Sequence, residues 1–184
     1  HGCFFFNNEQ DAIETTLIFL QIGLERKERC VYLPDPVTIE KAKTVFELAG
    51  MNVAKETEKG SLVLTSERSF LVNGRFDKNR MIQFVDQAYR DALKAGFTGL
   101  RGTGDVVWEL GEDFDMEEFS RYERKLDKFL ENKKTTILCQ YNLQTVPPEY
   151  LRESLFRHNA VVENTAICLD NHFHNSLYDF PLSP

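Results

Sequence analysis

The stretch from His1 to Leu33, HGCFFFNNEQDAIETTLIFLQIGLERKERCVYL, decides the fold of this chain of 184 residues. It opens with a short apolar run, 2–6, which the turn at Asn7-Asn8 ends, and apolar residues then recur at helical spacing over 11–26. A second apolar run follows at 30–33. Two nearly unbroken apolar strands joined by an amphipathic helix predict a β-α-β unit whose strands are parallel and buried on both faces.

The same alternation of strands and helices continues along the chain to Leu169. We expect further strands at 61–65, 97–101, 135–141 and 165–169, and further helices at 38–49, 77–95, from 115 onward and at 147–158. This order predicts an α/β fold, with a three-layer, mostly parallel sheet of about six strands that carries helices on both faces. Residues 1–169 are expected to form one domain, and 170–184 a C-terminal tail or a linker towards an output domain.

Composition limits the class of partner. The formal net charge is -7, which argues against direct binding to nucleic acid or to an anionic membrane, since both require a basic face. The four cysteines form no CxxC pair and lie in apolar runs, which is typical of reduced core cysteines. Without a signal peptide or an apolar run long enough to cross a bilayer, the sequence indicates a cytoplasmic protein.

The first turn lacks the chemistry that binds phosphate. The opening of the chain resembles RecA-like and KaiC-like ATPases, in which the turn after the first strand is GxxxxGK[ST] and cradles phosphate with backbone N–H groups and a lysine. Here the turn is NNEQDA, at 7–12, with no glycine, no lysine and two acids. Acidic groups at a helix N-terminus repel phosphate, so we expect no ATP hydrolysis, and the protein is predicted not to be an enzyme.

Polar residues at the carboxyl ends of the expected strands are the candidates for ligand binding, because ligands of parallel α/β sheets bind at that edge. Arg101 either grips an anion with its guanidinium group or pairs with an acid such as Asp105 or Glu123. Trp108 either contributes to the same site or packs in the core. The candidate ligand-binding residues are Asn7, Asn8, Asp35, Arg101, Thr103, Asp105, Trp108, Gln140 and Tyr141.

Four further residues are possible additions to the site: His1, Cys139, Glu123 and His158. Cys139 reads better as a core residue, and Glu123 is expected to face Arg101 or solvent. No histidine–cysteine spacing of the kind found in zinc sites is present, so the sequence predicts neither a metal nor a cofactor.

Phrases spread over nearly the whole chain resemble the MEDS domain, the methanogen/methylotroph DcmR-type sensory domain. They are His1-x-Cys3-x-Phe5-Phe6, Phe19-Leu20 through Gly23-Leu24, Glu28 to Tyr32, Gly74-x-Phe76-Asp77 with Met81, Gly96-Phe97-x-Gly99-Leu100-Arg101-x-Thr103-Gly104, Trp108, Tyr122-Glu123, Leu138-Cys139-Gln140-Tyr141 and His158. The resemblance implies a RecA-like fold and a sensor of small one-carbon or hydrocarbon-derived compounds. It also implies that the domain is attached to a histidine kinase, a PAS module or a DNA-binding domain.

The leading hypothesis is therefore a small-molecule sensory domain of a signalling or transcription-regulating protein. The alternative is a protein–protein interaction module that forms a homodimer, is derived from a RecA-like ATPase and binds no ligand. Residual nucleotide binding and thiol chemistry at Cys139 are weaker hypotheses, because the 7–12 turn is acidic and no base is evident beside the thiol.

Overall fold

The computed structural model of the chain describes residues 1–106, 116–163 and 166–169. The helices are α1 (Glu9–Glu25), α2 (Pro36–Leu48), α3 (Val53–Glu58), α4 (Lys78–Lys94), α5 (Met116–Leu130) and α6 (Pro148–Arg157). The strands are β1 (Gly2–Phe6), β2 (Arg29–Leu33), β3 (Leu62–Leu64), β4 (Leu71–Val72), β5 (Arg75–Phe76), β6 (Leu100–Asp105), β7 (Thr135–Asn142), β8 (Ala160–Glu163) and β9 (Ala166–Leu169).

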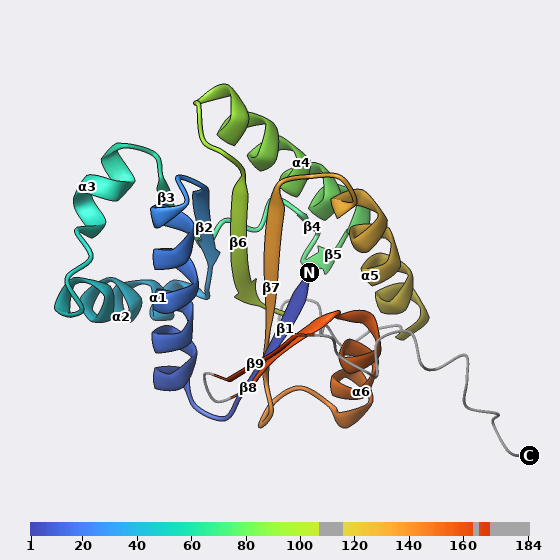
Figure 1. Cartoon of the computed structure of the whole chain (residues 1–184). Coiled ribbons are helices and arrows are strands. Elements are labelled where there is room, and N and C mark those ends of the chain that lie inside the picture. The colour runs from blue at the N-terminus through green and yellow to red at the C-terminus, as the bar shows by residue number, and fades with distance from the viewer. Residues whose placement is uncertain (107–115, 164–165, 170–184) are drawn as a thin grey trace, which may run out of the picture.

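Seven strands form the main sheet in the order β3-β2-β6-β7-β1-β8-β9 (Figure 1). All neighbouring pairs are parallel except β8 and β9, which form an antiparallel pair at one edge. β1 lies between β7 and β8, with Cys3 opposite Cys139 and Val161. The predicted three-layer, mostly parallel sheet of about six strands is confirmed. β9, the strand expected at 165–169, forms an antiparallel edge.

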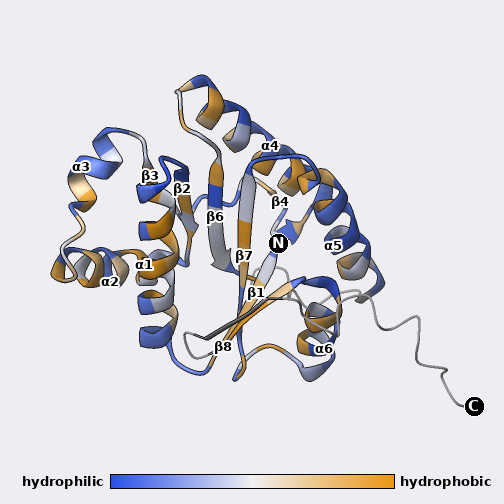
Figure 2. Cartoon of the chain, viewed as in Figure 1, coloured by the Kyte–Doolittle hydropathy of each residue, from blue (hydrophilic) through white to orange (hydrophobic). Residues whose placement is uncertain are grey.

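Helices cover both faces of the sheet. α1, α2 and α3 lie on one side in Figure 1, and α4, α5 and α6 lie on the other. Leu20 of α1 packs with Tyr32 of β2 and Phe46 of α2, all buried. On the opposite face, Met81 of α4 and Tyr122 of α5 belong to one buried cluster, while the α6 side chains pack beside them. Figure 2 shows hydrophobic residues concentrated where α1 and β7 lie inside the molecule.

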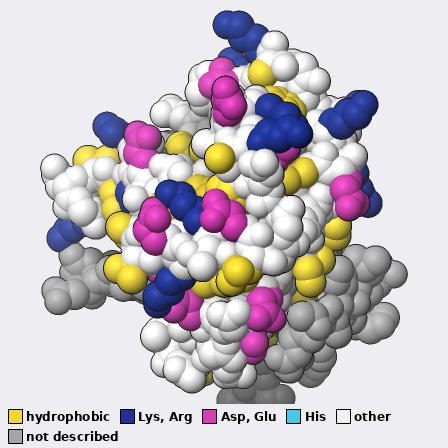
Figure 3. Space-filling view, turned by 90° about the vertical axis from the view of Figure 1, so that its left-hand side faces the viewer, with side chains coloured by type: hydrophobic (Ala, Val, Ile, Leu, Met, Phe, Trp, Pro, Cys, Tyr) yellow, Lys and Arg dark blue, Asp and Glu magenta, His cyan; other side chains and the backbone are white. Residues whose placement is uncertain are grey.

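The outer surface carries mixed charge. On the side of α1, α2 and α3, acidic, basic and hydrophobic side chains are interspersed without one sign dominating (Figure 3). Two large apolar residues of α2, Val37 and Leu48, are well exposed. In the parts of the chain that the structure describes, no helix combines the length and the apolar character that crossing a membrane requires.

The structure differs from the sequence prediction in three places. The strand expected at 97–101 runs instead over Leu100–Asp105, so it begins and ends several residues later than predicted. The segment before α4 holds a short helix, α3, and a hairpin of β4 and β5 that were not predicted. A strand at Ala160–Glu163, also not predicted, is the one that pairs in parallel with β1. These short elements have too few residues for a periodic pattern to be seen.

Gly23 determines how closely α1 approaches the sheet. A Cβ atom at this position would lie 2.5 Å from the Cys30 Sγ and 2.6 Å from the Arg101 Cδ, distances that packed atoms do not reach. Since both neighbours are buried, neither moves away at little cost.

We expect Gly23→Ala to lower the free energy of unfolding by about 1–3 kcal/mol through overpacking. Helix propensity alone predicts that the free energy of unfolding rises by about 1 kcal/mol. The sign of the measured change therefore distinguishes overpacking from helix propensity. Chemical denaturation measures the change, with Glu25→Ala at an exposed position of the same helix as control. A Gly23→Ala protein as stable as the original would show that α1 does not pack this closely.

Candidate functional site

Arg101 lies near the amino end of β6, not at the carboxyl end where the sequence placed it. Its side chain is buried, and its Nε donates a hydrogen bond to the Glu28 Oε2 at 2.6 Å. The guanidinium carbon also lies 4.6 Å from the centroid of the Phe19 ring. Arg101 thus pairs with an acid, but that acid is Glu28 and not Asp105 or Glu123.

The β1–α1 turn, where RecA-like ATPases bind phosphate, is occupied by the chain's own polar groups. Asn8 caps α1, because its Oδ1 accepts a hydrogen bond from the Asp11 backbone N–H. Glu9 accepts hydrogen bonds from the Lys41 ammonium group and from the Thr38 hydroxyl. These two hydrogen bonds lower the pKa of the Glu9 carboxyl. Asp35 caps α2 through the backbone N–H groups that follow it. Two carboxylates therefore stand at the helix N-termini that attract phosphate in other proteins.

Gln140 belongs to a buried polar network on the α1 face of the sheet. Its amide nitrogen donates to the Thr16 Oγ1 at 2.7 Å and to the Thr103 Oγ1 at 2.8 Å. The Thr103 hydroxyl in turn donates to the Leu138 backbone carbonyl at 2.7 Å. The three polar side chains are almost completely buried, so this network joins β6, β7 and α1 and leaves no opening for a ligand.

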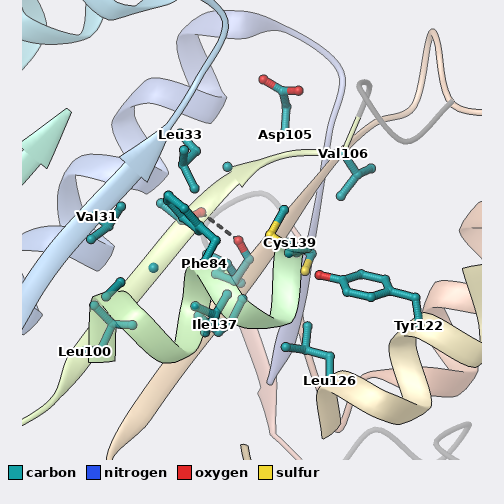
Figure 4. A pocket seen from close by; sticks show the side chains of 17 residues that line it. Val31, Leu33, Phe84, Leu100, Asp105, Val106, Tyr122, Leu126, Ile137 and Cys139 are labelled. Atoms are coloured by element: carbon teal, nitrogen blue, oxygen red, sulfur yellow. Dashed lines mark hydrogen bonds between the residues drawn. The ribbon is translucent and has the colours of Figure 1, made fainter. Parts of the chain in front are cut away.

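A partly open cavity of about 70 Å³ lies on the other face, between the sheet and helices α4 and α5 (Figure 4). Its walls are mainly apolar, and Gly102 and Gly104 of β6 are among the lining residues. A Cβ atom at Gly104 would lie 2.7 Å from the Leu33 carbonyl oxygen, so this position requires glycine. Figure 4 shows the Tyr122 hydroxyl directed towards Cys139 at one end of the cavity. The lining residues include Val31, Leu33, Met81, Phe84, Val85, Ala88, Leu100, Thr103, Asp105, Tyr122, Leu126, Ile137 and Cys139.

Two histidines, a cysteine and a carboxylate meet beside this cavity. The ligand atoms of His1, Cys139 and His158 all lie within 4.8 Å of one another. The Glu123 Oε2 lies 3.7 Å from the His1 Nε2 and 3.6 Å from the His158 Nε2, and the side chains of all three residues are nearly or fully buried. The expectation that Glu123 faces Arg101 or solvent is therefore wrong. α5 packs against α6 and turns this side chain inward.

Burial and charge set the protonation of this histidine–cysteine–glutamate cluster. Burial raises the pKa of Glu123 to about 7, against the opposing effect of the nearby His1 charge. Burial alone would lower the pKa of His1, but the hydrogen bond to Asp127 and the charges of Glu123 and Asp127 raise it above its ordinary value. Burial raises the pKa of Cys3, on the neighbouring strand, far above that of a free thiol, so Cys3 is an inert thiol.

The structure brings some of the predicted site residues together and separates others. Cys139, Thr103 and Asp105 are among the residues that line the cavity. Arg101 and Gln140 lie on the α1 face of the sheet, where the Thr103 hydroxyl is also hydrogen-bonded to Gln140. The capping residues Asn8 and Asp35 lie at helix starts, Asn7 is exposed in the same turn, and Tyr141 is buried next to Phe5. Trp108 lies outside the described residues.

Sequence reasoning missed the α4 wall of the cavity, formed by Met81, Phe84, Val85 and Ala88. A cavity-lining helix face looks the same in sequence as a core face, so no signal marked it. Gly102 and Gly104, at alternate positions of one strand, were the available clue to the cavity, because glycine places no side chain on that face of the sheet.

Fold and site together define a RecA-like α/β domain whose phosphate-loop position is filled by helix caps and carboxylates. In structure the chain is similar to the flagellar accessory protein FlaH from Methanocaldococcus jannaschii, with a TM-score of 0.58, 12% identity, and coverage of 88% of this chain and 69% of that chain. At this identity the likeness shows the fold alone, and no curated protein sequence matches. The family model "MEthanogen/methylotroph, DcmR Sensory domain" matches residues 1–159, and the chain belongs to this MEDS family of sensory domains.

We expect Arg101→Ala to lower the free energy of unfolding by about 3 kcal/mol, because it leaves the Glu28 carboxylate largely buried without its cation. Arg121→Ala is the matched control, since Arg121 and Glu117 also lie 2.6 Å apart but are both well exposed. The control is expected to cost less than about 1 kcal/mol. Equal losses in the two variants, measured by urea denaturation, would contradict a structural role for the buried pair.

Proposed function

We propose that this domain senses a small one-carbon or hydrocarbon-derived compound, which binds in the apolar cavity between the sheet and helices α4 and α5. The observation that carries the proposal is the cavity itself, with a volume of about 70 Å³ and mainly apolar walls. An apolar protein cavity of about 150 Å³ binds benzene, so a cavity of half that size suits a compound of about three heavy atoms. Tyr122 and Cys139 supply polar groups that would orient such a compound.

The elements around the cavity offer a route for the signal. α4 and α5 both contribute walls, and β6 runs past the cavity to Val106. A ligand in the cavity favours the arrangement of α4 and α5 that packs around it. Binding therefore shifts the equilibrium between the ligand-free and the ligand-bound arrangement of these helices. The expected anion-binding role of Arg101 does not enter this mechanism, since its guanidinium group is paired with Glu28.

The output of the sensor belongs to the same proposal. We propose attachment to a histidine kinase, a PAS module or a DNA-binding domain in the full-length protein, as the family resemblance implies, and a homodimer as the working unit. Direct contact with nucleic acid or membrane is not part of the proposal, because the chain has a net charge of -7.

Thermal unfolding in the presence of a panel of compounds tests the proposal. The panel contains methanol, formaldehyde, methylamines, halomethanes, short carboxylates and nucleotides. A compound present at about a hundredfold its Kd stabilises the folded state by about 2.7 kcal/mol, which raises the Tm clearly.

A variant that fills the cavity ties any response to this site. Ala88→Leu places a larger side chain in the cavity wall, and we expect it to abolish stabilisation by the bound compound. Gln87→Leu adds the same side chain one position away, where the helix surface is exposed, and we expect it to retain the full response. Isothermal titration of both variants with the compound found in the screen measures the difference.

Each other outcome of this experiment argues against the proposal. A response that survives in Ala88→Leu would place the ligand elsewhere. Stabilisation by nucleotides alone would favour a retained nucleotide site, despite the carboxylates Glu9 and Asp35 at the helix starts. No response to any compound would favour the interaction module that binds no ligand.

A further inference from the structure

We propose that His1, Glu123, Cys139 and His158 form a binding site for a zinc ion. Nothing in the sequence spacing marks this site, because its ligands come from four separate parts of the chain. His1 precedes β1, Glu123 lies in α5, Cys139 lies in β7, and His158 follows α6. Only the order of the strands and the packing of α5 against α6 bring them together.

Three of the distances between the donor atoms match those of a tetrahedral zinc site. Bonds of about 2.0–2.3 Å from zinc to nitrogen, oxygen and sulfur place neighbouring ligand atoms about 3.3–3.7 Å apart in a tetrahedron. The His1 Nε2 lies 3.4 Å from the Cys139 Sγ and 3.7 Å from the Glu123 Oε2. The His158 Nε2 lies 3.6 Å from the same Glu123 oxygen. The ligand atoms of His1, Cys139 and His158 all lie within 4.8 Å of one another, so the remaining donor pairs reach tetrahedral distances by a shift of the side chains.

Both imidazole rings are held in the orientation that a metal ligand needs. The His1 Nδ1 is hydrogen-bonded to the Asp127 Oδ1 at 2.8 Å, and the His158 Nδ1 to the Ser154 backbone carbonyl at 2.7 Å. These acceptors favour a proton on each Nδ1, which leaves each Nε2 lone pair directed at the centre. A carboxylate or carbonyl behind the histidine is the common outer shell of protein zinc sites.

The buried negative charge of the cluster also favours binding of a cation. The Glu123 side chain is completely buried, and neither of its carboxylate oxygens has a hydrogen-bond partner among the described residues. A buried carboxylate without such partners is energetically costly. With two neutral imidazoles, one carboxylate and one thiolate, a divalent ion makes the buried site electrically neutral.

The donor set selects the kind of ion. Two imidazoles and a thiolate suit zinc and other borderline-soft metals, whereas magnesium and calcium prefer oxygen ligands. Zinc binding replaces the proton of the Cys139 thiol and any proton on the His1 Nε2 or the Glu123 carboxylate, so bonds from these atoms to hydrogen are exchanged for bonds to zinc and the protons pass to the buffer. No oxidation or reduction is involved.

The site does not depend on the proposed sensing of a small compound, although the two are neighbours. Cys139 lines the apolar cavity and also lies against His1, so a bound zinc ion would lie beside the cavity wall. A protein can hold the metal and bind no compound, or the reverse, and the two experiments give separate answers.

The test begins with the purified chain, stripped of metal with a chelator and dialysed against ZnCl₂. We expect about one zinc ion per chain after removal of excess metal, and a higher Tm with ZnCl₂ but not with MgCl₂. Replacement by CoCl₂ is expected to give the thiolate-to-cobalt charge-transfer absorption and the visible bands of a tetrahedral ion. This spectrum reports thiolate ligation without any variant.

Variants assign the ligands. We expect Cys139→Ser and His158→Gln each to weaken zinc binding by more than about 100-fold, and Asp127→Asn, behind His1, by about 10–100-fold. The double variant His172→Ala with His174→Ala removes the other two histidines of the chain and is expected to bind zinc unchanged. Cys30→Ala, which removes a buried thiol on the α1 face, is the control for nonspecific thiol binding.

Three results would overturn the proposal: no zinc retained by the original chain, a cobalt spectrum without the thiolate band, or loss of zinc in the His172/His174 variant. Retention of zinc by both Cys139→Ser and His158→Gln would also exclude this site. Circular dichroism of the metal-free variants separates loss of a ligand from loss of the fold. If a variant does not fold, the cobalt spectrum of the original chain decides the result.

Discussion

The alternation of side chains along β7, which is covered by helices on both faces, organises the rest of the structure. Leu138 and Gln140 point to the α1 face, where Gln140 joins Thr103 and Thr16 in a closed polar network. Cys139 and Tyr141 point to the face of α4, α5 and α6. Successive side chains of a strand point to opposite faces of the sheet. One short segment therefore supplies Gln140 to the buried polar network on the α1 face and Cys139 to the opposite face.

The closed face has lost the features by which RecA-like ATPases bind nucleotides. Carboxylates at the starts of α1 and α2 occupy the helix N-termini through hydrogen bonds within the chain. Arg101, the most conspicuous cation of the sequence, is neutralised by Glu28 and covered by Phe19. The cavity lies on the other face of the sheet, beside Gly102 and Gly104 of β6.

The fold could be predicted from the sequence because its main strands and helices are long enough to show a period. The apolar runs at 2–6 and 30–33 and the helix between them already specify two parallel strands of one sheet, and the family phrases agree with this. The site could be predicted only in part. His1, Glu123, Cys139 and His158 were noticed one by one, but their meeting depends on the strand order and on the packing of α5, neither of which a local pattern encodes.

α5 connects the two features of the open face. Tyr122 and Leu126, four residues apart, line the cavity, whereas Glu123 and Asp127, also four residues apart, face His1. Successive helical positions differ by about 100°, so the two pairs form adjacent stripes on one rigid helix. A rotation of α5 that enlarges the cavity must therefore move a buried carboxylate relative to its histidine partners, which is energetically costly.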